Sequence, residues 1–207
     1  GVRFPNSAAE PDVDDSSECI TRDHNKCILC GDCVRMCNEV QNVGAIDYAH
    51  RGSHMKISTV FDIPISESTC VGCGQCAAVC PTGAITIKRH VNKVWSMLDD
   101  ENVKTVVQIA PAVRVALGKE LGLAEGENGM GKIVAALRRI GFDEVYDTST
   151  GADLTVLEES NEFIQRLEKG GYEIPLFTSC CPAWVQFCEK KYPEMLPHVS
   201  TCRSPMQ

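Results

Sequence analysis

The sequence is short of basic residues. Its 207 residues include 20 lysines and arginines but 28 aspartates and glutamates, which gives a net charge of −8. A surface that binds nucleic acid needs a stripe of Lys and Arg to neutralise phosphates, and the sequence contains no such stripe. We therefore expect no nucleic-acid partner, whereas an acidic surface can dock basic partners.

Long hydrophobic runs and a secretion signal are also missing. No stretch of about 18 apolar residues occurs, so we expect no membrane-spanning helix. The first 20 residues, GVRFPNSAAEPDVDDSSECI, are polar and acidic, whereas a signal peptide has an apolar centre. We therefore expect a cytoplasmic protein.

The sequence is, by contrast, rich in cysteine, with thirteen residues. An odd number disfavours a framework in which every cysteine is paired in a disulfide. A chain of this length has no need of covalent staples, and nothing in it points to export. The cysteines are therefore metal ligands or buried thiols, and their spacing decides between the two.

One cysteine pattern occurs twice, as CILCGDCVRMC at 27–37 and as CVGCGQCAAVC at 70–80. Each run has the spacing C-x2-C-x2-C-x3-C, which is typical of bacterial ferredoxins with two [4Fe–4S] clusters, and its fourth cysteine reaches the other cluster. Zinc would favour two separated C-x2-C pairs, so two tandem runs indicate iron–sulfur clusters. The predicted ligands are Cys27, Cys30, Cys33 and Cys80 for cluster A, and Cys70, Cys73, Cys76 and Cys37 for cluster B.

The first half of the chain divides by composition. Residues 1–22 are rich in proline and aspartate, cannot build a core and are predicted to be a linker or the tail of an upstream domain. Residues 23–93 are predicted to form an α+β ferredoxin-like domain, with strands in the β-branched and aromatic segment 46–65. His24 lies close to Cys27, has no ligand pattern and is predicted to be a surface residue.

Residues 94–207 alternate between strand and helix patterns, which predicts an α/β domain with a parallel sheet and helices. Thr150 and Asp153 resemble a capping box that opens a helix, and Gly141 ends another. The expected strands lie at 103–111, 143–147 and 174–179, and the expected helices lie at 113–123, 131–141, 150–169 and 182–191.

The segment TSCCPAW at 178–184 places two adjacent cysteines between a strand and a helix that starts at Pro182. The N-terminal end of a helix lowers the pKa of a thiol and stabilises an anionic cluster. A pair of buried structural cysteines is the alternative explanation of this segment taken alone.

Together with the two cysteine runs, QIAPAVRVALG at 108–118, TSCCPAW and STCRSP at 200–205 occur in the order found in [FeFe]-hydrogenases. From about Asp23 to Gln207 the sequence therefore resembles the catalytic subunit of that family. It is most similar to the types whose ferredoxin-like domain feeds a catalytic domain, including NAD(P)-linked multisubunit enzymes. The resemblance implies that residues 94–207 are the first, incomplete part of the domain that holds the catalytic H-cluster.

In this family the H-cluster is a [4Fe–4S] cluster bridged by a cysteine sulfur to a diiron centre with CO, cyanide and azadithiolate ligands. The resemblance implies that Cys181 is a ligand of the [4Fe–4S] part and that Cys180 passes protons to the azadithiolate amine. It also implies that Ala110, Pro111 and Ser204 line the diiron pocket.

A proton path is also implied. Glu159, Glu162 and Arg166 have the spacing i, i+3 and i+7, which places them on one face of a helix. The resemblance implies that they relay protons, with Ser200, to Cys180. The alternative is a solvent-exposed pair between Glu162 and Arg166, worth about 0.3–0.5 kcal/mol.

The resemblance implies an enzyme that catalyses 2H⁺ + 2e⁻ ⇌ H₂. Electrons would pass through the two [4Fe–4S] clusters from ferredoxin, or from an NAD(P)H-oxidising flavoprotein and [2Fe–2S] subunits of a hetero-oligomer. Three further H-cluster cysteines of the family have no counterpart here, so we expect a segment that is inactive alone. Cys19, Cys188 and Cys202 are expected to be structural or incidental thiols. The alternatives are a non-catalytic electron-transfer or redox-sensing protein on the same scaffold and, as the weakest choice, a plain ferredoxin.

Overall fold

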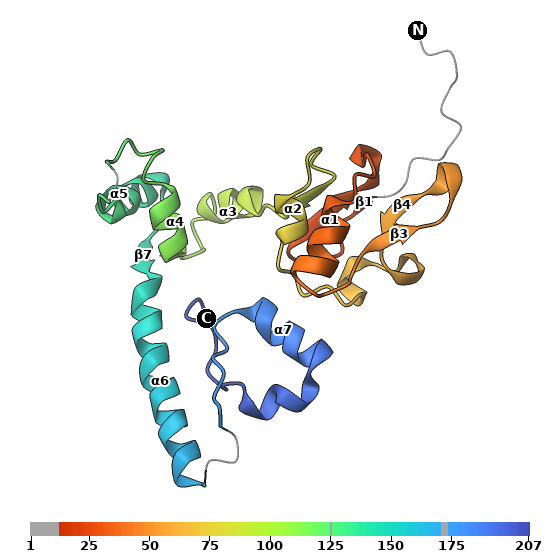
Figure 1. The fold of residues 1–207 in the computed structure, drawn as a ribbon. Coiled ribbons are helices and arrows are strands. Elements are labelled where there is room, and N and C mark those ends of the chain that lie inside the picture. The colour runs from red at the N-terminus through yellow and green to blue at the C-terminus, as the bar shows by residue number, and fades with distance from the viewer. Residues whose placement is uncertain (1–12, 125, 171–173) are drawn as a thin grey trace. The chain divides into compact units, whose positions relative to one another are not determined.

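The computed structural model describes residues 13–124, 126–170 and 174–207, and the chain divides into two compact units after Arg89 (Figure 1). The first unit contains both cysteine runs, and the second contains the TSCCPAW segment. Among the described residues, none of the helices combines the length and the hydrophobicity that a membrane crossing requires.

Short strands and helical turns build the first unit. An antiparallel sheet has the order β1 (Val13–Asp14), β2 (Ile20–Asp23) and β5 (Ile85–Ile87), and β3 (Asp47–Ala49) pairs antiparallel with β4 (Lys56–Ser58). The helical segments are α1 (Asp32–Arg35), a π-helical turn (Met36–Val40), α2 (Gln75–Ala78) and 3-10 turns at His24–Lys26, Gly52–His54, Val60–Asp62 and Ile65–Glu67. The unit thus mixes helix and sheet, as predicted.

Strand β2 shows how the sheet packs on the cysteine runs. Ile20 and Arg22 are buried, whereas Thr21 and Asp23 are partly exposed, as expected for a strand with one face towards a core. The buried core consists of Ile20, Cys33, Val34, Ile46, Ile57, Ile65 and Ile85. Five further cysteines pack against it, namely Cys27, Cys37, Cys70, Cys76 and Cys80. Burial of this apolar surface therefore brings the two cysteine runs together.

Residues 13–22 belong to this sheet, although composition predicts a linker there. Strand β1 pairs with β2, and the carboxylate of Asp14 binds the side chain of Arg22 and the backbone N–H of Ile65. An acidic segment with few apolar residues is thus held by an ion pair and by backbone hydrogen bonds. The rest of the predicted linker, residues 1–12, lies outside the described residues.

Both cysteine runs turn at a glycine. Gly31 and Gly74 follow the second cysteine of each run and have φ angles of 79° and 73°, a left-handed conformation that favours glycine. Helices α1 and α2 start directly after these residues. A Cβ at either position would also collide with a neighbouring side chain, Tyr48 or Ile87, so the same local geometry recurs in both runs.

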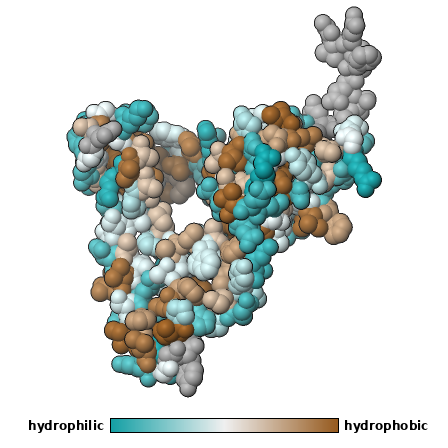
Figure 2. Space-filling view, in the orientation of Figure 1, coloured by the Kyte–Doolittle hydropathy of each residue, from teal (hydrophilic) through white to brown (hydrophobic). Residues whose placement is uncertain are grey.

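The second unit contains a parallel strand pair and longer helices. Strands β6 (Val106–Ile109) and β7 (Glu144–Asp147) pair in parallel, as predicted for an α/β arrangement. The helices are α3 (Val91–Leu98), α4 (Pro111–Ala116), α5 (Met130–Ile140), α6 (Thr148–Glu168), α7 (Pro182–Lys191) and a 3-10 segment at Pro193–His198. Helices α4 and α5 lie between β6 and β7 in the chain and supply the crossover that parallel strands require. Helix α6 leaves several apolar side chains exposed (Figure 2). Leu154, Leu157 and Ile164 are among them.

The predicted capping box of α6 is wrong. Asp147, the last residue of β7, is the N-cap, and its carboxylate accepts a hydrogen bond from the N–H of Ser149 at 2.9 Å. The extended backbone of Asp147 lets it cap the helix directly. Thr150 therefore lies inside the helix.

The predicted strand at 174–179 is not formed. Phe177 makes an isolated parallel bridge with Val199, with hydrogen bonds from its N–H to the carbonyl of His198 and from the N–H of Ser200 to its carbonyl. A strand needs a continuous partner along its length, and here the partner is one short segment. The bridge ties the residues before TSCCPAW to the residues before STCRSP.

Candidate metal centre

Site A is a cavity in the first unit that contains the predicted ligands of cluster A. Its lining includes Cys27, Cys30, Cys33 and Cys80. Ile57 and Ile85 add apolar surface, and His24, half-buried, also lines the cavity instead of lying on the surface as predicted. Burial, followed by the nearby thiol of Cys27, raises the pKa of Cys33 to about 11. Metal binding has the opposite effect on the pKa of a thiol, because a coordinating thiol loses its proton.

Site B gathers the predicted ligands of cluster B. Burial, followed by the neighbouring thiols of Cys70 and Cys73, raises the pKa of Cys76 to about 12, and Cys37 is also close enough to contribute. Each cysteine run thus supplies three thiols to one site and one thiol to the other. This crossed arrangement is the one that the ligand prediction requires, and ligation itself stays a prediction.

Backbone N–H groups point at sulfur atoms in both sites. They run from Ala45 to Cys37 at 3.3 Å, from Gly72 to Cys70 at 3.4 Å and from Ile85 to Cys80 at 3.5 Å. Burial by itself would raise the pKa of Cys80, but the N–H groups of Ile85 and Thr82 outweigh it and lower that pKa. Hydrogen bonds of this kind stabilise thiolates and help to set the reduction potential of a cluster.

The donor sets fit [4Fe–4S] clusters. All thirteen cysteines lie within the described residues, and none of them forms a disulfide. Each site offers four thiols, apolar neighbours and N–H groups directed at sulfur. These are the features with which proteins hold such clusters.

The TSCCPAW segment of the second unit meets the start of α7. Cys181 is the N-cap residue of α7 and Pro182 is its first residue, which confirms the predicted helix start. Cys180 and Cys181 are both exposed. The hydroxyl of Ser179 donates a hydrogen bond to the carbonyl of Cys202, so TSCCPAW lies beside STCRSP.

Glu162 on α6 is the centre of a hydrogen-bond network with the STCRSP segment. Its carboxylate accepts hydrogen bonds from the hydroxyl of Ser200 at 2.7 Å, from Arg166 at 2.6 Å and from the N–H of Thr201 at 3.2 Å. Burial by itself would raise the pKa of Glu162, but the hydrogen bonds from Ser200 and Arg166 outweigh it and lower that pKa. Glu162 is therefore a carboxylate at neutral pH.

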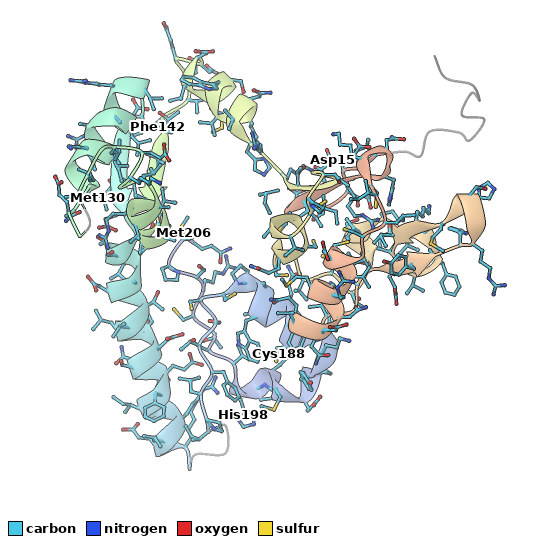
Figure 3. All side chains as sticks on the ribbon, turned by 45° about the horizontal axis from the view of Figure 1, so that its top comes forward. Asp15, Met130, Phe142, Cys188, His198 and Met206 are labelled. Carbon is cyan, nitrogen blue, oxygen red and sulfur yellow. The ribbon has the colours of Figure 1, made fainter. Side chains whose placement is uncertain are left out.

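Arg166 is buried. The alternative prediction, a solvent-exposed ion pair between Glu162 and Arg166, is therefore wrong. The side chain of Arg166 is 8% exposed, and it also donates to the carbonyls of Pro197 at 2.7 Å and Val199 at 3.0 Å. His198, between these residues, lies beside the C-terminal part of α6 (Figure 3). The carbonyls of Pro197 and Val199 are 31 and 33 residues away from Arg166 in the sequence. Local sequence patterns do not encode such contacts, so they could not be predicted.

Glu159 lies one turn before Glu162 on α6. Its Oε1 atom is buried and has no hydrogen-bond partner among the described residues. A buried oxygen without a partner is costly, so this position favours a further hydrogen-bond donor such as a water molecule. No hydrogen bond within the described part of the chain joins Cys180 to Glu159, Glu162 or Ser200, so the last step of the predicted relay is not a direct contact.

Ala110 and Pro111 lie directly after β6, as the N-cap and first residue of α4. The C-terminal segment reaches the same end of the strand pair. The side chain of Gln108 donates to the carbonyl of Met206 at 3.4 Å, and the hydroxyl of Thr148 contacts Met206 Sδ at 3.5 Å (Figure 3). Two predicted pocket-lining residues therefore lie near the segment that follows STCRSP.

Ser204 lines a shallow depression formed by both segments. The other lining residues include Ser179, Pro182, Ser200, Thr201 and Cys202. Gly151 of α6 lies so close to Pro205 that a Cβ would collide with its carbonyl. STCRSP is thus packed against α6 as well as against TSCCPAW.

Three thiols lie outside these sites. Cys188 in α7 is completely buried, which fits the predicted structural role. Cys19 is exposed, and its sulfur lies against Gly72 of the second cysteine run. Cys202 contributes its backbone N–H and carbonyl to the contacts with Ser200 and Ser179.

Three family models match the chain. Residues 103–207 match the iron only hydrogenase large subunit, C-terminal domain. Residues 26–84 match a 4Fe-4S dicluster domain, and residues 62–114 match a second model of that description. The first match covers β6 to the C-terminal segment, and the second covers both cysteine runs.

The chain is similar to proteins of known name. It is 45% identical over 198 residues to the NADP-reducing hydrogenase subunit HndD of Solidesulfovibrio fructosivorans, covering 93% of this chain and 34% of that protein. It is 30% identical over 153 residues to cytosolic iron-sulfur assembly component 3 of Bos taurus, covering 69% and 32%. A solved variant of the [FeFe]-hydrogenase HydA1 from Chlamydomonas reinhardtii matches with a TM-score of 0.52 and 44% identity, covering 57% and 31%. The chain thus spans about a third of the length of these relatives.

Fold and donor sets together define an iron–sulfur protein with a ferredoxin-like unit. Residues 103–207, which make up half of the chain and lie in the second unit, match the C-terminal domain of the iron-only hydrogenases. The chain therefore belongs to the [FeFe]-hydrogenase family, and the resemblance predicted from its motifs is confirmed.

Proposed function

We propose that this chain is the electron-relay and first active-site part of an [FeFe]-hydrogenase that catalyses 2H⁺ + 2e⁻ ⇌ H₂. The proposal rests on the hydrogen-bond network of Glu162, Arg166 and Ser200, in which Arg166 and Ser200 are buried and Glu162 is partly buried. Ser200 belongs to the STCRSP segment, which contacts TSCCPAW through Cys202 and Ser179. A protein that only transfers electrons does not need a partly buried carboxylate that a serine and an arginine hold in place. The family match over residues 103–207 supports the same conclusion.

The two thiol sets would hold the relay clusters. Cys27, Cys30, Cys33 and Cys80 would bind cluster A, and Cys70, Cys73, Cys76 and Cys37 would bind cluster B. Cys181, at the N-terminal end of α7, would supply one ligand to the H-cluster, which provides the redox chemistry at which protons and electrons combine. Ala110, Pro111 and Ser204 would line the pocket around it.

The protein groups on α6 and STCRSP would move the protons. Glu162 is held as a carboxylate by Ser200 and Arg166. Glu159 offers a second carboxyl group, whose Oε1 atom has no hydrogen-bond partner in the described part of the chain. Rotation of these groups would pass one proton at a time towards the thiol of Cys180. Arg166 would hold Glu162 beside the segment before Ser200, because it binds the carboxylate of Glu162 and the carbonyls of Pro197 and Val199.

Electron partners would dock on the complete protein. We infer ferredoxin, or an NAD(P)H-oxidising flavoprotein with [2Fe–2S] subunits in a hetero-oligomer, as the source of electrons. The relative HndD is a subunit of an NADP-reducing hydrogenase, which supports the second possibility. We place this assembly in the cytoplasm.

The second candidate is a non-catalytic iron–sulfur protein on the same scaffold. The similarity to cytosolic iron-sulfur assembly component 3 favours it, because that relative is named for iron–sulfur assembly and not as a hydrogenase, and it aligns with 69% of this chain at 30% identity. In that case Cys180 and Glu162 would have no role in proton transfer.

A conservative substitution separates the two candidates. Glu162→Gln in the complete hydrogenase keeps a hydrogen-bond acceptor but cannot take up a proton, so hydrogen evolution with a chemical electron donor should fall at least about 100-fold. The control is Glu158→Gln, an exposed residue of the same helix, which should leave turnover unchanged. Equal turnover in wild type and Glu162→Gln, with full iron content, would contradict the proposed relay.

A further inference from the structure

Arg22 is a charged residue in a core position beside site A. It lies on the inward face of β2, two residues after Ile20, and is 4% exposed. It lines the same cavity as the four thiols of site A. A guanidinium is always charged at physiological pH, and a buried charge is stable only where other groups compensate it.

The second cysteine run has no such charge. Arg22 stands five residues before Cys27, and the residue five positions before Cys70 is Ile65. Ile65 is 2% exposed, so both positions are buried. The two cysteine runs therefore differ at the matching position, which holds a cation in the first run and an apolar side chain in the second.

Asp14 compensates Arg22 only in part. Its Oδ2 accepts hydrogen bonds from Nη2 at 2.6 Å and from Nε at 3.2 Å, and also from the N–H of Ile65 at 3.1 Å. The Nη1 atom of Arg22 is buried and has no hydrogen-bond partner among the described residues. A buried donor without an acceptor is costly, which indicates that the cavity receives a group with acceptor atoms. The sulfur atoms of a cluster are such acceptors.

The other ionisable neighbours leave Arg22 as the positive charge of site A. Asp23, which also lines the cavity, is paired with Lys26 at 2.9 Å. Burial, followed by the charge of Arg22, lowers the pKa of His24, so that side chain is neutral at neutral pH. Lys56 is paired with Asp62 at 3.1 Å. Asp14, with a pKa of about 2, stays ionised and faces Arg22 from β1.

We propose that Arg22 gives cluster A a higher reduction potential than cluster B, an inference that rests on the proposed ligand sets. One electron from a one-electron donor protein adds one negative charge at site A, and no proton is transferred. The guanidinium and its Nη1–H stabilise this added charge. The residue at the matching position of the second run, Ile65, is uncharged. At equilibrium, an electron shared between the two clusters therefore resides mainly on cluster A, and reduced cluster B is the stronger reductant.

Two variants should shift the potential in opposite directions. Arg22→Ile introduces the residue of the second cysteine run. It should lower the equilibrium constant for reduction of cluster A about tenfold, which for a one-electron couple corresponds to a decrease of about 59 mV in its midpoint potential. Asp14→Asn removes the compensating charge and should raise it. Ile65→Val is the matched control and should move neither potential. The measurement is an anaerobic titration of the chain with dithionite, followed by electron paramagnetic resonance.

Arg22→Ile should narrow the gap between the two midpoint potentials, and Asp14→Asn should widen it. Shifts of the same sign in both variants, or unchanged potentials with both clusters present, would overturn the inference while leaving the relay function intact. If Arg22→Ile fails to hold cluster A, the sign of the shift in Asp14→Asn decides. A wild-type chain with fewer than two [4Fe–4S] clusters would instead contradict the proposed ligand sets themselves.

Discussion

Asp14 and Arg22 form an ion pair whose side chains are only 15% and 5% exposed. Removing one member of a buried pair leaves the other charge without compensation. Asp14→Ala should therefore lower the free energy of unfolding of the first unit by about 3 kcal/mol, measured by anaerobic urea unfolding at pH 7. Asp15→Ala, at an exposed neighbouring carboxylate, is the control and should have little effect.

The same pair gives a pH dependence. Burial by itself would raise the pKa of Asp14, but the hydrogen bonds from Ser16 and Arg22 outweigh it and lower the value from 3.8 to about 2. Because the folded pKa is depressed, the stabilisation is complete above about pH 4 and is lost as the pH falls towards 2. The difference between wild type and Asp14→Ala should shrink over that interval, and a difference that grows there would contradict the assignment.

Residues with local, repeated signals could be predicted from the sequence. The crossed grouping of the thiols follows from a spacing that occurs twice, so Cys33 and Cys76 lie among the expected neighbours. Arg22 could not be predicted as a core residue, because its burial depends on Asp14, which composition alone assigns to a linker. A charged residue where the second run has Ile65 is a signal that comparing the two runs could have found.

At the scale of elements, α6 depends on its cap. Asp147 accepts the N–H of Ser149, whereas Thr150 lies within the helix. Asp147→Ala should therefore make amide hydrogen exchange in the first turn of α6 several-fold faster. Thr150→Ala is the control and should change it little. A larger increase in amide exchange in Thr150→Ala than in Asp147→Ala would instead support the capping box predicted from the sequence.

Elements that depend on local pattern were predicted better than elements that depend on distant partners. Helix α7 begins at Pro182 as expected, because proline after Cys181 fixes the first turn. The segment 174–179 has the composition of a strand, but its strand pairing within the described residues is the single bridge between Phe177 and Val199. That pairing depends on STCRSP, which is separated from it by a whole helix, and local composition does not encode it.

At the scale of the whole molecule, the two units separate two tasks. The first unit gathers eight thiols into two sites, and the second holds Cys180, Cys181 and the Glu162 network. Each unit draws its site from segments far apart in the sequence. The family match was predictable because the five motifs are short and ordered, whereas the packing of STCRSP against α6 was not.

We expect the first unit to hold two [4Fe–4S] clusters, one at each thiol site. The most direct test is the iron and acid-labile sulfide content of the anaerobically purified chain. Sites A and B together require about eight iron and eight sulfide atoms per chain, because each cluster contains four of each. A content of about four iron atoms or fewer in undamaged protein would contradict the two-cluster account.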